Sequence, residues 1–177
     1  SYVWVAHDEK AESLRAAETY LAVAVTGGLV MLMGLLLLYR ETGTLEIDRL
    51  YEACRSIMTG FGTEAEAGRR TLYIAGTCML FGFGAKAGCF PLHIWLPKAH
   101  PVAPAPASAL LSGILTKTGI FGIIVVSCRM FGADRSWGLL MVILGLVTMF
   151  LGALLAVFSI NLKRTLACSS VSQIGFI

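Results

Sequence analysis

The chain has 177 residues, of which 56% are hydrophobic and only 14% are charged. Soluble domains usually carry about 25% charged residues, so this composition excludes an ordinary soluble domain and favours a membrane protein. The net charge of +3 is too small to indicate a protein that binds nucleic acid.

The first membrane span is predicted at residues 20–39. Residues 1–18 are polar and are expected to form a loop that leads into the membrane. The twenty residues 20–39 carry no charge. At about 1.5 Å per residue, a helix of this length crosses a hydrocarbon core of about 30 Å.

Residues 44–61 have the pattern of an amphipathic helix. Their apolar positions recur at helical spacing, at 47, 50, 51, 54, 57, 58 and 61, and the opposite face is charged. The pattern favours a helix that lies on the membrane surface. A docking helix for a partner subunit is the alternative.

A second span begins near Thr71 and runs uncharged for fifteen residues, up to Lys86. Pro91 and Pro97 follow, and each removes a backbone donor, so the helix is predicted to break near Pro91 and again at Pro97. In a membrane, the freed backbone groups survive only against protein or water. A polar pocket is therefore expected beside the break, and residues 97–107, with their four prolines, are expected to form a stiff extended loop.

Three further apolar stretches complete the predicted fold. Residues 108–128 and 138–160 are the third and fourth spans, and a fifth begins at 165 and is cut short by the end of the chain. The predicted fold class is an all-α polytopic membrane protein with four complete transmembrane helices and a truncated fifth. Residues 1–177 are expected to be part of a single transmembrane domain whose earlier and later helices lie outside this fragment.

Lysines within the predicted spans are the main candidates for function. Ten of the eleven acids precede residue 71, and Asp134 is the only one after it, so Lys86 and Lys117 have almost no local carboxylate to pair with. A lysine at the centre of a span costs about 2.5–3.5 kcal/mol. Such residues usually face the protein interior or a wet cavity and mark ion or proton paths, so buried lysines are predicted here. The alternative for Lys86 is an interfacial position, if the span effectively ends at Pro91.

Two histidines lie just beyond the predicted break. Because imidazole changes its charge near neutral pH, His93 and His100 are candidate proton relays, with a purely structural role as the alternative. The five cysteines form no CxxC pair and have no histidines at ligand spacing. We therefore expect small core thiols, and no bound metal and no cofactor.

Two segments carry a family resemblance. KAGCFPLHIWLPKAHPVAPAPASALLSGILTKTG, residues 86–119, and NLKRTLACSSVSQIGFI, residues 161–177, resemble signatures of the antiporter-like proton-channel subunits. These subunits occur in respiratory complex I, in membrane-bound hydrogenases of the hydrogenase-4 and formate hydrogenlyase kind, and in multisubunit cation/proton antiporters. The KAHPVAPAPASALLSG stretch is more similar to the hydrogenase branch.

The resemblance implies roles for single residues. Lys86 matches the family's lysine on a broken helix, which pairs with a glutamate on an earlier helix and changes its protonation. Lys117 matches the lysine that leads toward a central hydrophilic axis, and Lys163 matches a further candidate position on the proton path. Gln173 stands where relatives carry histidine, so no relay is expected there. SYVWVA resembles the end of the glutamate-bearing helix, which places that glutamate before Ser1.

The resemblance implies a proton-translocating membrane subunit of a redox-driven complex, NADH:quinone oxidoreductase-like or a membrane-bound hydrogenase, with no redox centre of its own. The expected partners are other membrane subunits of such a complex and the lipid bilayer, in a bacterial or archaeal cytoplasmic membrane, with no nucleic acid. A subunit of a multisubunit Na⁺/H⁺ antiporter and a non-pumping membrane scaffold are the alternatives.

Overall fold

A computed structural model describes residues 2–7, 10–132 and 134–177, and every regular element among them is helical. Four stretches are long and apolar enough to cross a membrane, Ala11–Thr42, Thr63–Val102, Ala105–Met130 and Arg135–Val157. The predicted all-α polytopic fold is therefore confirmed. The elements in chain order are α1 (Tyr2–Val5), α2 (Ala11–Thr42), α3 (Ile47–Thr59), α4 (Thr63–Ala87), η1 (Leu92–Ile94), α5 (Trp95–Val102), α6 (Ala105–Leu110), the π-helical turn η2 (Leu111–Leu115), α7 (Thr116–Met130), α8 (Arg135–Val157) and α9 (Leu162–Phe176).

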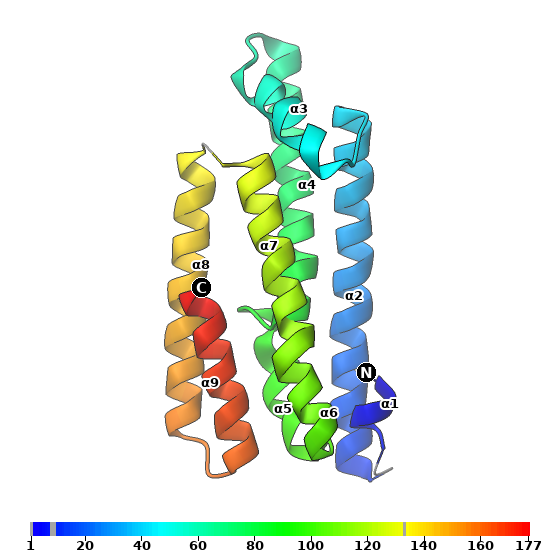
Figure 1. Cartoon of the computed structure of the whole chain (residues 1–177), viewed down its shortest axis with the longest axis vertical. Helices are drawn as coiled ribbons and strands as arrows, with labels where there is room; N and C mark the ends of the chain where they lie inside the picture. The colour runs from blue at the N-terminus through cyan, green and yellow to red at the C-terminus, as the bar shows by residue number, and fades with distance from the viewer. Residues whose placement is uncertain (1, 8–9, 133) are drawn as a thin grey trace.

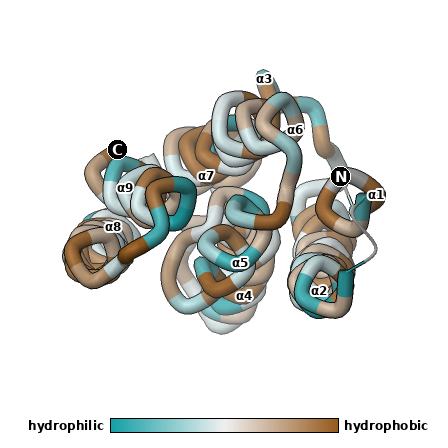
Figure 2. Tube along the Cα trace, turned by 90° about the horizontal axis from the view of Figure 1, so that it is seen from below, coloured by the Kyte–Doolittle hydropathy of each residue, from teal (hydrophilic) through white to brown (hydrophobic). Residues whose placement is uncertain are grey.

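The long helices α2, α4, α7 and α8 run along one common axis (Figure 1). The short helix α3 crosses one end of this bundle, and α5 and α6 lie at the other end, near the start of α2. Seen along the axis, α5 overlies α4, with α2 on one side and the α8–α9 pair on the other (Figure 2). The two views together show that α5 continues α4 at the centre of the molecule.

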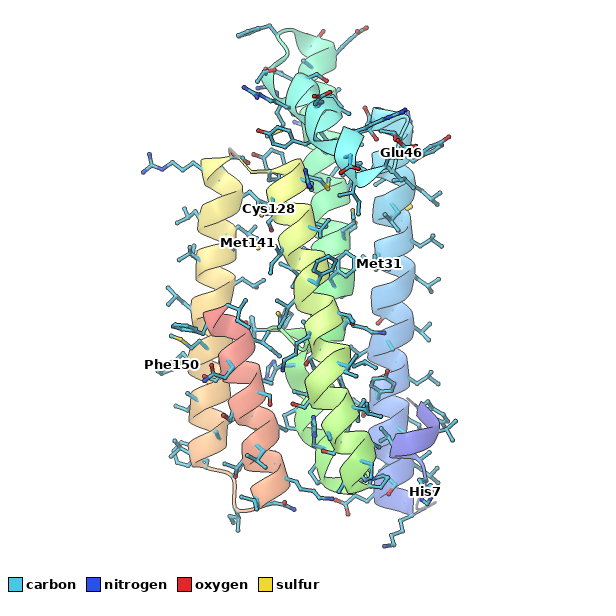
Figure 3. All side chains as sticks on the ribbon, in the orientation of Figure 1. His7, Met31, Glu46, Cys128, Met141 and Phe150 are labelled. Atoms are coloured by element: carbon cyan, nitrogen blue, oxygen red, sulfur yellow. The ribbon has the colours of Figure 1, made fainter. Side chains whose placement is uncertain are left out.

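The helices pack through separate apolar cores at the two ends of the bundle. Tyr20, Trp95 and Leu111 belong to the core beside α5, whereas Leu72 and Trp137 belong to the core beneath α3. The outer faces of α2 and α8 remain largely exposed and apolar. Phe150 points outward from the edge of α8 (Figure 3). Such surfaces are stable against lipid or further transmembrane helices.

The predicted amphipathic helix is confirmed as α3. Its buried residues Leu50 and Cys54 face the bundle, while the charged residues lie on its outer side. Burial raises the pKa of the Cys54 thiol to about 11, so this thiol stays protonated and packs as a small apolar group. Whether α3 also touches lipid headgroups or a partner subunit stays a prediction.

Two local predictions about the first half of the chain are wrong. The stretch 1–18 is not simply a loop, because α2 already begins at Ala11. Residues 97–107 are not an extended loop either, because α5 continues to Val102 and α6 begins at Ala105. Pro97 and Pro106 lie in the first turns of α5 and α6, where a proline has no helical hydrogen bond to lose, whereas Pro101 lies inside α5, one residue before its end.

Pro97 was also predicted as a second break, and this is wrong for the same reason. It lies in the first turn of α5, which begins at Trp95. The actual break lies between Gly88 and Pro91. Gly88 ends α4 in the left-handed conformation, with φ of +82°, and its N–H donates to Gly84 O at 2.8 Å. Glycine favours this cap because a side chain would be strained there.

Asp134, the only acid after residue 71, joins three helices at the α3 end of the bundle. Its Oδ1 accepts a hydrogen bond from the Ser136 N–H at 3.1 Å and caps α8. Its other carboxylate oxygen accepts from the Tyr73 hydroxyl of α4. Between them, Phe131 at the end of α7 stacks on Trp137 with ring centroids 4.0 Å apart. The carboxylate therefore holds the α7–α8 turn against α4.

We expect Asp134→Ala to lower the thermal midpoint of the detergent-solubilised protein by several degrees. The change removes a helix cap, which contributes about 1 kcal/mol, and leaves the Tyr73 hydroxyl without its acceptor. Asp134→Asn keeps an acceptor, so its thermal midpoint should lie between those of the alanine variant and the wild type. Equal melting of the alanine variant and the wild type would contradict this role.

Candidate functional site

Lys86 lies in the last turn of α4, directly before the break. The free carbonyls at a helix C-terminus carry partial negative charge, so this end of α4 favours a cation. The side chain lines a cavity of about 270 Å³ between α2, α4, α5 and α7. The remaining lining residues are Tyr20, Ala24, Gly28, Met31, Gly82, Phe83, Ala85, Trp95, Leu115 and Thr118. Figure 3 shows Met31 pointing from α2 toward α4 and α7.

The sequence predicted a polar pocket beside the break, and the cavity next to Lys86 differs from that prediction in its lining. Its walls are mostly apolar, and Tyr20 and Thr118 are the hydroxyl-bearing residues among them. Tyr20 also packs edge-on against Trp95, with ring centroids 5.0 Å apart. The pocket thus connects the transmembrane helix α2 with both halves of the broken helix.

Lys117 lies at the same level of the bundle, on α7. The backbones of α4 and α7 come close together at Gly119, where an added Cβ would lie 2.5 Å from Ala87 N. Lys117 is two residues away, and a helix rises only about 1.5 Å per residue. Lys117 therefore lies near the depth of the break and of Lys86, but it does not line the same cavity.

The Lys117 ammonium is held by the π-helical turn that precedes it. Its Nζ donates to Ser112 O at 2.8 Å, and the Thr116 hydroxyl donates to the same carbonyl at 2.8 Å. The Ser112 hydroxyl lies 3.1 Å from the Ser170 hydroxyl of α9. A chain of polar groups thus leads from Lys117 to α9. π-Helical turns of this kind are frequent at functional sites.

Both lysines are exposed on the surface of this chain, so the expectation that they face the protein interior or a wet cavity in the membrane stays a prediction. The prediction counted depth along a span, and depth does not say which face of the helix a residue occupies. A charged group at this depth is unstable against lipid. The face that carries the two ammonium groups therefore needs protein or water against it in the membrane.

The two histidines carry polar atoms that lack partners. Among the described residues, His93 Nδ1 and His100 Nε2 are the buried side-chain atoms with no hydrogen-bond partner. His100 on α5 is only 4% exposed, and its Nδ1 lies 2.5 Å from Ser108 Oγ. Leaving a buried polar atom without a partner is costly, so such atoms usually bind an internal water molecule.

Lys163 lies away from the other two lysines, at the start of α9. Its Nζ donates to Ala103 O at 3.1 Å, where α5 ends. It also lines a second cavity of about 310 Å³ at this end of the bundle, with Lys10, Glu12, Ser13, Pro101, Val102, Ala103 and Pro104. The structure therefore does not bring Lys163 into the cavity of Lys86. Gln173 is an exposed residue of α9.

Sequence reasoning missed several residues around the break, above all Thr148, Trp95 and the Ser112–Ser170 pair. One signal was present for Thr148, because it is the only polar side chain between Gly138 and Val157. The serines gave no such signal. Among the described residues, no three potential metal-ligating side chains come together, and all five cysteines are free thiols.

Comparison with known proteins places this arrangement in a family. The transmembrane family described as NADH:quinone oxidoreductase/Mrp antiporter matches residues 1–177. Hydrogenase-4 component B of Escherichia coli is 36% identical over 99% of this chain, which covers 25% of that relative. Formate hydrogenlyase subunit 3 of the same organism is 32% identical over 92% of the chain and is also covered to 25%. The chain thus spans about a quarter of the length of these relatives.

Solved structures agree with the sequence comparison. A chain of the Mrp complex from Dietzia sp. DQ12-45-1b superposes on 94% of this chain with a TM-score of 0.80 and 29% identity, and 29% of that chain is covered. A chain of an archaeal membrane-bound sulfane sulfur reductase superposes with a TM-score of 0.82 at 24% identity over 98% of this chain and 34% of its own length, which supports the fold alone. Given the match over its whole length, the chain belongs to the NADH:quinone oxidoreductase/Mrp antiporter transmembrane family.

Proposed function

We propose that the full-length protein is a proton-translocating membrane subunit of a redox-driven complex, either NADH:quinone oxidoreductase-like or a membrane-bound hydrogenase. The observation that carries this proposal is the position of Lys86, in the last turn of a broken transmembrane helix and facing a cavity. The relatives named hydrogenase-4 component B and formate hydrogenlyase subunit 3 favour the hydrogenase form.

In this proposal, Lys86 and Lys117 carry the protons. Lys86 lies beside the C-terminal carbonyls of α4 and lines a mostly apolar cavity. A carboxylate on a helix outside this fragment is the proposed partner of Lys86.

His93 and His100 are the proposed relays between the break and the end of α5. Their partnerless ring nitrogens are places for water, and water next to imidazole provides a route for proton exchange. Lys163 adds a positive charge at the end of this route. The proposed partners are other membrane subunits of the complex, which would cover the face that carries Lys86 and Lys117.

The second candidate is a subunit of a multisubunit Na⁺/H⁺ antiporter. The superposition on a chain of the Mrp complex favours it, and the same lysines would serve. A scaffold that retains the fold without transport is a third possibility, and it assigns no transport role to the lysines.

One experiment on the full-length wild-type complex in inverted membrane vesicles separates these candidates. A pH-sensitive dye reports the proton concentration inside the vesicles. In Na⁺-free buffer, we expect the lumen to acidify when the redox substrate of the complex is added. An antiporter would give no response to that substrate and a pH change on addition of Na⁺ to energised vesicles. A scaffold would give neither signal, and either of these results would refute the redox-driven proposal.

A further inference from the structure

The break in the central helix leaves backbone groups without helical partners inside the membrane, and each needs another partner there. At the end of α4, the N–H groups of Gly88 and Cys89 both donate to Gly84 O. The indole N–H of Trp95, in the first turn of α5, donates to Ala85 O at 2.8 Å. These bonds lie within the broken helix itself, so they do not fix its position relative to the rest of the bundle.

Thr148 of α8 binds the break from outside. The Phe90 N–H donates to Thr148 Oγ1 at 3.2 Å, and the hydroxyl donates in turn to Leu144 O at 2.7 Å. Thr148 is 1% exposed, in the middle of an otherwise apolar helix. A polar side chain at such a position usually has a specific partner, and here the partner is the backbone of the break.

Lys163 of α9 binds the other end of the segment. Ala103, which ends α5, donates its N–H to Ala99 O and accepts the Lys163 ammonium on its own carbonyl. Ala103 is buried, and it lies in the two-residue gap before α6. A cation at the last carbonyls of a helix is favourable because it offsets the partial negative charge there.

Both contacts come from the same helical pair. α8 and α9 form a hairpin (Figure 1), and Gly152 allows their backbones to touch, since an added Cβ would lie 2.5 Å from Ser172 N. The Ser172 hydroxyl also donates to Met149 O at 3.1 Å. The hairpin is therefore a tightly packed unit that holds the segment Gly88–Ala103 at both of its ends.

We propose that Thr148 and Lys163 are positioning residues, which fix the broken segment and thereby place Lys86, His93 and His100 on the proton path. This inference rests on the proposed function. It gives Lys163 a role different from that of a proton carrier, because Lys163 acts through Ala103 and α5. It also implies that a shift of the α8–α9 hairpin moves both ends of the segment together.

The test uses two variants of the full-length complex in inverted vesicles. Thr148→Val keeps the side-chain volume and removes the hydroxyl, and Lys163→Met keeps the aliphatic stem and removes the ammonium. We expect each to lower redox-driven proton uptake per assembled complex about tenfold, a typical consequence of leaving one buried backbone group without its partner. Thr148→Ser restores an acceptor for the Phe90 N–H, and Lys163→Arg restores a donor to Ala103 O, so both variants should recover most of the uptake.

Matched controls are available in the same chain. The Thr77 hydroxyl donates only to carbonyls of its own helix, Tyr73 O and Ile74 O, and its residue is exposed. Arg164 is an exposed cation next to Lys163. Thr77→Val and Arg164→Met should therefore pump like the wild type. If Thr148→Val and Lys163→Met also pump like the wild type, the positioning role is wrong.

Cys89, which lies in the break and is buried, provides a second readout. In a full-length protein whose other cysteines are all replaced by alanine, a maleimide should label Cys89 slowly, and about tenfold faster after Thr148→Val. Asp134→Ala destabilises the opposite end of the bundle and should leave this rate unchanged. Unchanged labelling in Thr148→Val would also overturn the inference.

The two measurements separate this inference from the proposed function. If the wild type takes up no protons with its redox substrate, the proposed function fails, while Cys89 labelling still tests whether Thr148 fixes the break. If the wild type does take up protons and only the positioning variants behave like their controls, the inference about Thr148 and Lys163 fails alone.

Discussion

Lys86→Met is expected to reduce redox-driven proton uptake by the full-length complex at least about a hundredfold, while the complex still assembles. Methionine has a similar length and is fully compatible with the mostly apolar cavity around this position. The substitution therefore removes the titratable group with little change in packing. A group that directly transfers a proton typically contributes a factor of about 10²–10⁴ to a rate.

The measurement is dye-reported acidification of inverted vesicles in Na⁺-free buffer, normalised to the amount of assembled complex. Lys98→Met is the matched control, because Lys98 is an exposed lysine on α5 of the same broken helix and lies outside both cavities. It should pump like the wild type. Normal uptake in Lys86→Met would show that Lys86 is structural and would favour the antiporter or scaffold alternatives.

Gly119→Leu should cause the largest loss of folded protein. An added Cβ at this position would lie 2.5 Å from Ala87 N and 2.8 Å from Phe83 O. Both neighbours are backbone atoms, so no side-chain rotation relieves the clash, and α4 and α7 must separate. Overpacking a tight contact costs about 1–3 kcal/mol, and more where the backbone must move.

The measurement is the yield of monodisperse protein in size-exclusion chromatography after extraction in mild detergent. Gly138→Leu is the control, because nothing lies within 4 Å of a Cβ placed on Gly138 at the exposed start of α8. We expect this control to be extracted like the wild type. A Gly119→Leu protein that is equally well folded would mean that α4 and α7 can separate at the break without loss of structure.

The sequence by itself determined the class of protein and the position of its helices along the chain. In a membrane, a long uncharged run satisfies its backbone hydrogen bonds by forming a helix. The spans at residues 20–39, 108–128 and 138–160 were therefore predictable, and they match α2, α6–α7 and α8. The break before Pro91 was also predictable, because proline lacks a backbone donor and cannot continue the helix normally. The two family segments predicted the family itself.

The sequence was less informative where the outcome depends on a residue's position within a helix or around the helix axis. Pro97 and the loop 97–107 were misjudged because the effect of a proline depends on where a helix begins, and α5 begins at Trp95, two residues before Pro97. Lys86 and Lys117 are exposed on the surface of this chain, because length along a span measures depth and does not say which face of the helix a residue occupies; their burial in the membrane stays a prediction. Which neighbouring helix covers each face is decided by tertiary packing.

Only the tertiary structure joined residues far apart in the chain into one site. Gly119 brings Lys117 to the level of Lys86, Thr148 reaches a backbone donor 58 residues away, and Lys163 reaches a carbonyl 60 residues away. Such contacts follow from the way helices pack and leave no periodic signal in the sequence. Local rules thus determine which segments cross the membrane, whereas the close approach of particular helices decides which polar groups meet inside it.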